Sequence, residues 1–319
     1  MAYQRALSLK FLGDLKSVNG SLTPLLQRVR NDDTLMLALR GSYVNIYYRG
    51  GNLLKVSAMP AGGYSATFDA NYNQAGHVLP DFPFMIGEAL DAQKLADSIS
   101  ALKYTMDHYL TVHPKSEREF QQLVARENNC SPISNETEYF IVDIEAAGIV
   151  EEARFDMLGV RWLRNERKKQ DCLVPVLIEM KYGKDALGGK SGLKKHLDDA
   201  HRISDDSWKN LCNELEEQVN QLADLGLLQF TRSSLVQRLV VDQDAKKELI
   251  FLLANYNPAS NKIFGFLDTL QELPEDDKGR YDLLFFAASF AGYGLHRACM
   301  LDLASFKEVA KKLHEEATR

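Results

Sequence analysis

Hydrophobic runs separated by glycine turns dominate the first third of the chain. The runs are rich in Leu, Val, Ile and Tyr, and Gly41-Ser42 and Gly50-Gly51 stand between them. They occupy residues 35–40, 43–49 and 53–58. Two-residue glycine turns between such runs are typical of tight hairpins. We therefore predict an antiparallel meander, with residues 64–72 as a further strand.

A helical pattern follows the meander. Within residues 90–110, apolar side chains recur at the spacing of an amphipathic helix. These side chains are Leu95, Ile99, Leu102, Met106 and Leu110. The segment His113-Pro114-Lys115 then interrupts the pattern, because proline cannot continue a helix. We therefore predict an N-terminal domain of antiparallel strands and a helix over residues 1–112.

The order of elements changes after this boundary. Ser116 is suited to cap a helix in which Phe120 and Val124 follow helical spacing. Strand-like runs come next, at residues 139–147, 153–163 and 173–182. A helix that leads into three adjacent strands is an informative order. We predict that it begins a second domain, residues 113–319.

The rest of the chain alternates helices and strands. Residues 207–225 have a strong helical pattern, and the apolar run 248–254 suits a buried strand. Residues 283–289 are a further candidate strand, and residues 303–315 have the pattern of a closing amphipathic helix. These elements predict an α/β fold. Its mixed central sheet is flanked by helices, and the antiparallel-strand and helix domain precedes it.

Composition and charge exclude several classes of protein. The 319 residues are 45% hydrophobic and 26% charged, as in folded soluble proteins. With 38 Lys and Arg against 44 Asp and Glu, the formal charge is −6. This balance excludes a histone-like, polybasic protein that binds its partner through overall positive charge. A local basic face is still compatible with it. The most apolar late stretch, residues 283–295, is too short to cross a bilayer, so we expect no membrane partner.

Cysteine spacing and the N-terminus both indicate a cytoplasmic location. The cysteines lie too far apart in sequence for paired zinc ligands or a disulfide framework, so we expect reduced thiols. They are Cys130, Cys172, Cys212 and Cys299. The first residues lack the long apolar block and small-residue cleavage site of a secretory signal.

Charged residues interrupt two of the apolar strands. Glu179 and Lys181 end the third run and lie two residues apart, so they share one face of the strand. Asp156 lies near the start of the preceding run. If these runs pair as a hairpin, Asp156 and Glu179 can approach each other across the ladder. The alternative is that all three are surface residues, with Lys181 in an ion pair worth ~0 to 1 kcal/mol.

Two neighbouring carboxylates repel each other, and a divalent cation between them would offset the repulsion. Mg²⁺, for which Mn²⁺ can substitute, prefers carboxylate oxygens and retains water molecules. A lysine beside the cation could orient or help deprotonate one of those waters, while the cation stabilises charge on a phosphate. Asp156, Glu179 and Lys181 are therefore candidates for phosphodiester hydrolysis.

This residue set resembles the PD-(D/E)xK nuclease superfamily. The restriction-endonuclease-like core of that family has a helix, three strands, a helix and a fourth strand. Its signature is an Asp on the second strand and Glu-x-Lys on the third, which Asp156 and Glu179-Met180-Lys181 match, although Phe155 replaces the usual proline. The resemblance covers roughly residues 116–255. It implies an Mg²⁺-dependent endonuclease that acts on DNA and uses the two acids as metal ligands.

Many members of the family add a metal-contacting glutamate from the first helix. Glu117 shares a helix face with Phe120 and Val124, whereas Glu119 is turned away. The resemblance therefore implies that Glu117 is an auxiliary metal ligand, with Glu119 as the second choice.

Basic residues after the third strand are candidates for nucleic-acid binding. A glycine-rich, lysine-bearing turn that enters a helix can receive a phosphate through backbone N–H groups, and lysines neutralise phosphates. The candidates are Lys184, Lys190, Lys194, Lys195 and His196.

Other charged groups receive a plainer interpretation. Asp143 and Glu145 lie two residues apart on the first predicted strand, and a solvated strand face explains both. The basic segment that contains Arg164, Arg167 and Lys168-Lys169 is interpreted as a solvated loop, with a grip on a phosphate backbone as the alternative.

DNA is the partner that the resemblance implies, and many nucleases of this fold are homodimers because two strands must be cut. Family habit also suggests defence against foreign DNA. The N-terminal domain carries no motif with evident chemistry, so a protein partner is one role left open to it. The alternative function is a non-catalytic nucleic-acid-binding or assembly module of the same fold.

Overall fold

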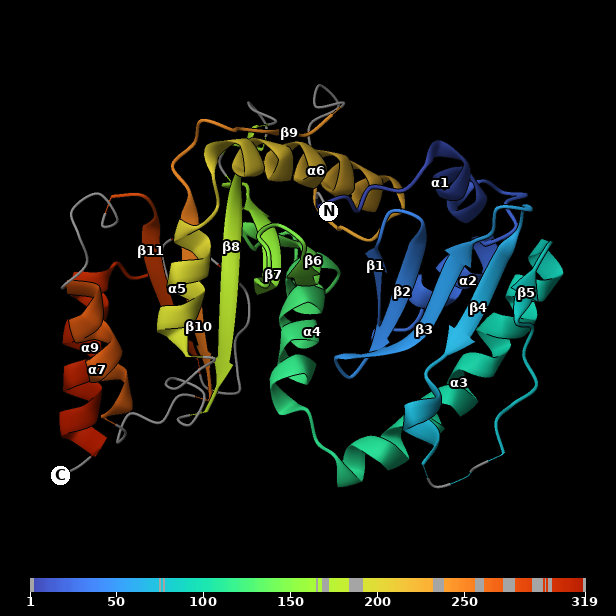
Figure 1. Ribbon diagram of the computed structural model, residues 1–319, viewed down its shortest axis with the longest axis horizontal. Coiled ribbons are helices and arrows are strands. Elements are labelled where there is room, and N and C mark those ends of the chain that lie inside the picture. Colours follow the sequence, from blue (N-terminus) through green and yellow to red (C-terminus); the bar gives the residue numbers. More distant parts are fainter. Residues whose placement is uncertain are drawn as a thin grey trace. The chain divides into compact units, whose positions relative to one another are not determined.

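The chain folds into two compact units with a sheet in each (Figure 1). The N-terminal unit comprises Gln4–Arg126 and Glu217–Gln229, and the C-terminal unit comprises Met1–Tyr3, Glu127–Glu216 and Phe230–Arg319. The computed structural model describes residues 3–74, 76, 78–164, 166–167, 172–183, 192–231, 238–255, 261–271, 279–288, 295, 297 and 300–317. Over these residues the protein is mixed α/β, with one antiparallel and one mixed sheet.

The sheet of the N-terminal unit is the predicted antiparallel meander. Its strands, in spatial order, are β1 (Leu35–Leu39), β2 (Tyr43–Tyr48), β3 (Gly51–Ala58), β4 (Tyr64–Phe68) and β5 (Met85–Ile86). Arg49 and Gly50 both have positive φ, 49° and 71°, as a tight two-residue hairpin turn requires. The strand predicted over residues 64–72 ends at Phe68, and a 3-10 helix, η1 (Ala70–Asn73), follows it.

Helices pack against this sheet. They are α1 (Leu9–Lys16), α2 (Thr23–Arg30) and α3 (Ala89–Val112). The long helix α3 confirms the helix predicted over residues 90–110. The sequence pattern missed α1 and α2, which have 8 residues each. Such short helices depend on tertiary packing, which Leu15, Leu22 and Leu25 supply here because all three are fully buried.

The chain leaves the N-terminal unit within a helix. The predicted boundary at residues 112 and 113 falls between α3 and α4 (Ser116–Asn129), whereas the units divide inside α4. The segment Glu217–Gln229 returns to the N-terminal unit. There the Gln221 side chain accepts a hydrogen bond from the Leu7 N–H at 2.8 Å and donates one to the Leu7 carbonyl at 2.9 Å.

The C-terminal unit contains the mixed sheet. Its path runs through β11 (Asp282–Ala288), β10 (Glu248–Ala254), β8 (Cys172–Tyr182), β7 (Arg154–Arg161) and β6 (Tyr139–Ala147), and β9 (Val240–Val241) pairs with β8 off this path. Strand β7 is antiparallel to both neighbours, whereas β10 is parallel to β8 and β11. Every residue of β10 is buried, as expected for a parallel strand covered on both faces. The five predicted strands of this region are confirmed.

Helices surround this sheet. They are α5 (Leu193–His201), α6 (Asp205–Asp224), α7 (Lys262–Gln271) and α9 (Leu303–Ala317). In Figure 1, α5 lies in front of β10 and beside β8, and α9 contacts both β11 and α7. The Tyr281 hydroxyl donates to the Ala200 carbonyl of α5 at 2.7 Å, which ties that helix to the start of β11. None of the helices in the described part of the chain is both long and apolar enough to span a bilayer.

Two charged residues lie in environments that differ from the prediction. Asp143 is fully buried, and the Tyr3 hydroxyl donates to its Oδ2 at 3.0 Å. The solvated-face interpretation of Asp143 was therefore wrong. The register of β6 against β7 shifts between Ile141 and Asp143, and such a bulge changes which side chains face inward. Glu145 is half-buried.

Arg167 is also buried, with 3% exposure, so neither the solvated-loop interpretation nor the phosphate alternative fits it. Its guanidinium lies over the rings of Phe140 and Trp162 and donates to the Thr137 carbonyl. Burial lowers the pKa of Arg167 to about 10. Lys168-Lys169 lie outside the described residues. Cys130, Cys172 and Cys212 are in no disulfide bond, and Cys299 lies outside the described residues.

Candidate functional site

The register of β7 against β8 brings Asp156 opposite Glu179. Met157 pairs with Ile178 at the end of this antiparallel ladder, so the next pair in the same register is Asp156 with Glu179. The Asp156 carboxylate turns toward β8, because its Oδ2 accepts a hydrogen bond from the Met180 N–H at 2.9 Å. The sequence pattern predicted this approach of the two acids.

Lys181 and a histidine from α5 hold the other acid. Lys181 Nζ lies 2.6 Å from Glu179 Oε1, and His196 Nε2 lies 2.8 Å from the same oxygen. Lys181 Nζ and His196 Nε2 are 3.3 Å apart. The side chains of Glu179, Lys181 and His196 are 0%, 5% and 12% exposed, so this is a largely dehydrated cluster. The surface-residue interpretation of Glu179 and Lys181 does not fit this burial.

Burial governs the protonation of the cluster. It raises the pKa of Asp156 to about 7, and the negative charge of Glu179 adds to the effect. Burial also raises the pKa of Glu179, which Lys181 partly offsets. The pKa of His196 is lowered to about 4 by burial and then by the charge of Lys181, so its imidazole is neutral at pH 7. The cluster therefore holds one lysine against two acids that are costly to ionise together.

One oxygen of the cluster lacks a protein donor. Glu179 Oε2 is buried and has no hydrogen-bond partner among the described residues. A buried carboxylate oxygen in that state is costly unless a proton or a cation occupies its free side. Two carboxylate oxygens at one end of a hairpin fit a hard cation, which protein sites commonly hold by one or two carboxylates plus waters. Within the described residues no group of three or more His, Cys, Asp and Glu side chains is arranged to hold a metal.

The auxiliary glutamates lie in the N-terminal unit. Helix α4 begins at Ser116, so Glu117 and Glu119 are in its first turn, as the pattern predicted. Glu119 accepts from Arg49 at 2.8 Å and is engaged with the β2–β3 turn. The role of Glu117 as a metal ligand stays a prediction.

The predicted nucleic-acid-binding residues separate into groups. Lys194 donates to Asp198 at 3.1 Å and Lys195 pairs with Asp199, each one turn further along α5. Nearby acids therefore partly neutralise both lysines. Lys184 and Lys190 lie outside the described residues. Contact with DNA stays a prediction for these lysines.

His196 does not stand with the lysines, because its ring contacts Glu179 inside the cluster. The spacing along α5 carried a signal for this position. Leu193, Leu197 and Ala200 are buried, and His196 follows Leu193 by three residues and precedes Ala200 by four. Residues at these intervals share one helix face. The spacing therefore held a signal for a buried His196, but using it requires the start of α5 to be known.

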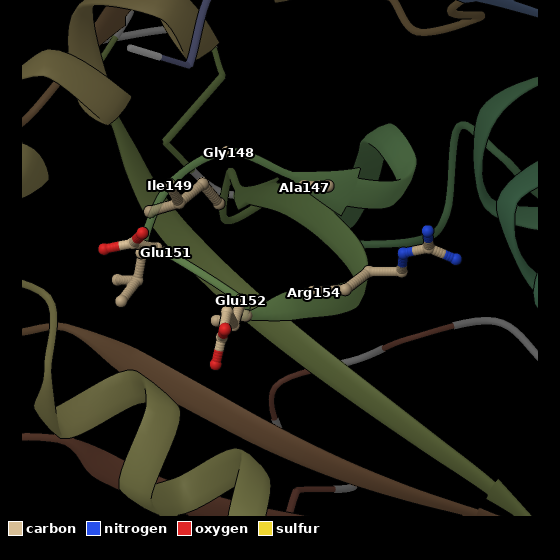
Figure 2. A pocket seen from close by; sticks show the side chains of 8 residues that line it. Ala147, Gly148, Ile149, Glu151, Glu152 and Arg154 are labelled. Atoms are coloured by element: carbon tan, nitrogen blue, oxygen red, sulfur yellow. The ribbon is translucent and has the colours of Figure 1, made fainter. Parts of the chain in front are cut away.

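A cavity of about 550 Å³ lies in the turn between β6 and β7 (Figure 2). Residues 147–154 line it, and Figure 2 shows the Arg154 side chain extending away from those of Glu151 and Glu152. The backbone carbonyl of Glu151 accepts from Arg202 at 2.6 Å, so this turn is tied to the end of α5. None of the four clustered residues Asp156, Glu179, Lys181 and His196 lines the cavity. The cluster and the cavity are therefore distinct features of the unit.

Comparison with known proteins adds no assignment. No protein-family model matches the chain, and no curated protein or solved structure is significantly similar to it. The chemistry of the site therefore rests on its own geometry.

Proposed function

We propose that the C-terminal unit is a divalent-cation-dependent nuclease that hydrolyses phosphodiester bonds in DNA. The observation that carries the proposal is the place of Asp156 at the end of the β7–β8 ladder, held by the Met180 N–H beside Glu179, with Lys181 at 2.6 Å from Glu179. The residues that would act are Asp156 and Glu179 as cation ligands and Lys181 beside them.

The donor set suits Mg²⁺ or Mn²⁺ better than a softer metal. Asp156 and Glu179 offer carboxylate oxygens, which hard cations prefer, and Glu179 Oε2 lacks a partner among the described residues. When bound, such a cation lowers the pKa of a coordinated water and stabilises charge on a phosphate. Without the cation, Asp156 keeps its proton up to a pH near its pKa of about 7, and this proton relieves the repulsion between the two acids.

The protein side chains position the reactants. Asp156 is fixed by the Met180 N–H, so its carboxylate cannot swing away from Glu179. Lys181 donates to Glu179 and is 5% exposed, which holds its ammonium group at the edge of the acid pair. From there Lys181 can orient a nucleophilic water or a phosphate oxygen. A positive charge in a partly dehydrated site is more effective than one in water.

The order of elements also supports the proposal. Helix α4 is followed by β6, β7 and β8, then by α5 and α6, and then by the two-residue β9 and by β10, which is parallel to β8. Apart from the second helix α6 and the short β9, this order resembles the helix, three strands, helix and strand of the restriction-endonuclease-like core. The acids lie on the second and third strands of that order, as in the family signature.

Cleavage of supercoiled plasmid by the full chain tests the proposal. With Mg²⁺ or Mn²⁺ we expect nicked and linear products that EDTA abolishes. Glu179→Ala should lose the activity, whereas Glu152→Gln, a change of an exposed acid in the β6–β7 turn, should keep it. DNA binding without cleavage by the wild type, in a gel-shift assay with either cation, would contradict the nuclease and favour a nucleic-acid-binding module.

A further inference from the structure

His196 makes a contact that the family signature does not require. Its Nε2 lies 2.8 Å from Glu179 Oε1, and its ring is 12% exposed. It reaches the acid from α5, whereas Asp156 and Glu179 come from strands. The histidine and Lys181 therefore meet at the same carboxylate oxygen from two different elements.

The geometry identifies which ring nitrogen carries the proton. A carboxylate oxygen only accepts hydrogen bonds when ionised, so a nitrogen 2.8 Å away must donate. Lys181 also only donates, and its longer distance of 3.3 Å to Nε2 fits two donors that share one acceptor. The neutral imidazole then carries its proton on Nε2. Its Nδ1 is buried and has no hydrogen-bond partner among the described residues, consistent with an unprotonated nitrogen.

We infer that His196 is a positioning residue of the proposed cation site, an inference that rests on the proposed function. The His196 Nε2–H group and the Lys181 ammonium group together fix Glu179 Oε1. With Oε1 held from two sides, Oε2 has no donor among the described residues unless Asp156 is protonated. Oε2, which lacks a partner among the described residues, is thereby kept for the cation. Such partners orient metal ligands and typically change metal affinity by 10 to 100-fold when removed.

Mn²⁺ binding to the full chain, measured by calorimetry and by the electron paramagnetic resonance of free Mn²⁺, tests the inference. We expect His196→Leu to weaken Mn²⁺ binding about 10-fold or more, because Glu179 loses one of its two donors. His196→Gln, whose amide can still donate, should recover most of the affinity. The matched control is His201→Gln on the same helix, whose ring packs 5.8 Å from that of Tyr281 and which should leave Mn²⁺ binding unchanged. Equal affinities for the wild type and His196→Leu would overturn the inference.

A second measurement needs no bound metal. The ¹⁵N shifts of His196 in the cation-free wild type should show a protonated Nε2 and an unprotonated Nδ1. The Nε2 signal should move in Glu179→Gln, because its acceptor changes. A proton on Nδ1 instead would overturn the positioning role. If the wild type binds no Mn²⁺ but the Nε2–H tautomer is present, the proposed nuclease fails while the contact between His196 and Glu179 stands.

Discussion

Asp156 accepts a hydrogen bond from the backbone N–H of Met180, the residue that follows Glu179 in the Glu-x-Lys motif. This bond, at 2.9 Å, ties an acid of β7 to the end of β8. It holds two carboxylates together that would otherwise separate. Proteins keep such an unfavourable pair where a cation or a shared proton stabilises it.

The two acids should respond oppositely to removal of their charge. In EDTA at about pH 8, Asp156→Asn should raise the free energy of unfolding by roughly 1 to 3 kcal/mol, because it relieves the repulsion and keeps an acceptor for Met180. Glu179→Gln should lower it by roughly 2 kcal/mol or more, because Lys181 loses a buried counter-charge. Urea denaturation measures both. Equal destabilisation by the two variants would show that repulsion between the acids is not important.

The pH dependence of stability should separate Asp156 from His196. Folding raises the pKa of Asp156 from 3.8 to about 7, so the folded state binds its proton more tightly and loses stability as the pH rises through that range. Folding lowers the pKa of His196 from 6.5 to about 4, so stability increases as the pH rises between those values. In the wild type the two effects oppose each other.

Variants of Asp156 and His196 separate the two contributions to the pH dependence of stability. Relative to the wild type in EDTA, the free energy of unfolding of Asp156→Asn should rise from about pH 4 to about pH 7, because the loss due to Asp156 is gone. That of His196→Gln should fall from about pH 4 to pH 6.5, because the gain due to His196 is gone. Denaturation series at several pH values check both. Variants that track the wild type in parallel would rule out these protonation changes.

The β2–β3 turn should tolerate no side chain at Gly50. A Cβ at Gly50 would lie 2.2 Å from the backbone carbon of Arg118 in α4, and the φ of Gly50 is +71°. Gly62 has a φ of +94° but open space around it. Gly50→Ala should therefore destabilise the N-terminal unit by at least about 2 kcal/mol more than Gly62→Ala, which carries only the backbone strain. Similar thermal melting of the two variants would mean that the contact with Arg118 relaxes easily.

In the mixed sheet of the C-terminal unit, a buried ion pair lies at the end of β7 opposite to Asp156, and breaking it should cost much stability. Arg161 donates to Glu248 at 2.8 Å, and the Glu248 side chain is 3% exposed. Arg161→Met should cost roughly 3 to 5 kcal/mol, because it leaves a buried acid without its main cation. The control is Arg164→Met, since Arg164 pairs with Glu136 on the surface, where their side chains are 59% and 48% exposed. That change should cost less than about 1 kcal/mol in the same chemical denaturation experiment.

Much of the fold could be predicted from the sequence because long helices and strands repeat the hydrophobic spacing that is typical of each. The fully buried strand β10 and the long helix α3 carry enough apolar residues to be recognised in isolation. Helices α1 and α2 do not, since 8 residues are too few for a helix to be stable without the packing of its neighbours. The burial of Asp143 was hidden for a similar reason. It depends on a bulge in β6 and on Tyr3, about 140 residues away in sequence.

The site was readable in part. The spacing of Glu179 and Lys181 and the register of a hairpin are local properties, so the approach of Asp156 followed from the pattern. The place of His196 did not follow from the pattern, because a histidine beside lysines in a glycine-rich segment also suits a phosphate-binding loop. Its position on the buried face of α5 decides between these interpretations, and that requires the start of the helix to be known.

Diffraction from crystals of the full chain soaked in Mn²⁺ tests the central claim most directly. We expect an anomalous peak between the carboxylates of Asp156 and Glu179, about 2.1 Å from an oxygen of each, with Lys181 beside it. An ion bound elsewhere, or no ion while Asp156 and Glu179 share a proton at high Mn²⁺ concentration, would contradict a cation-dependent site.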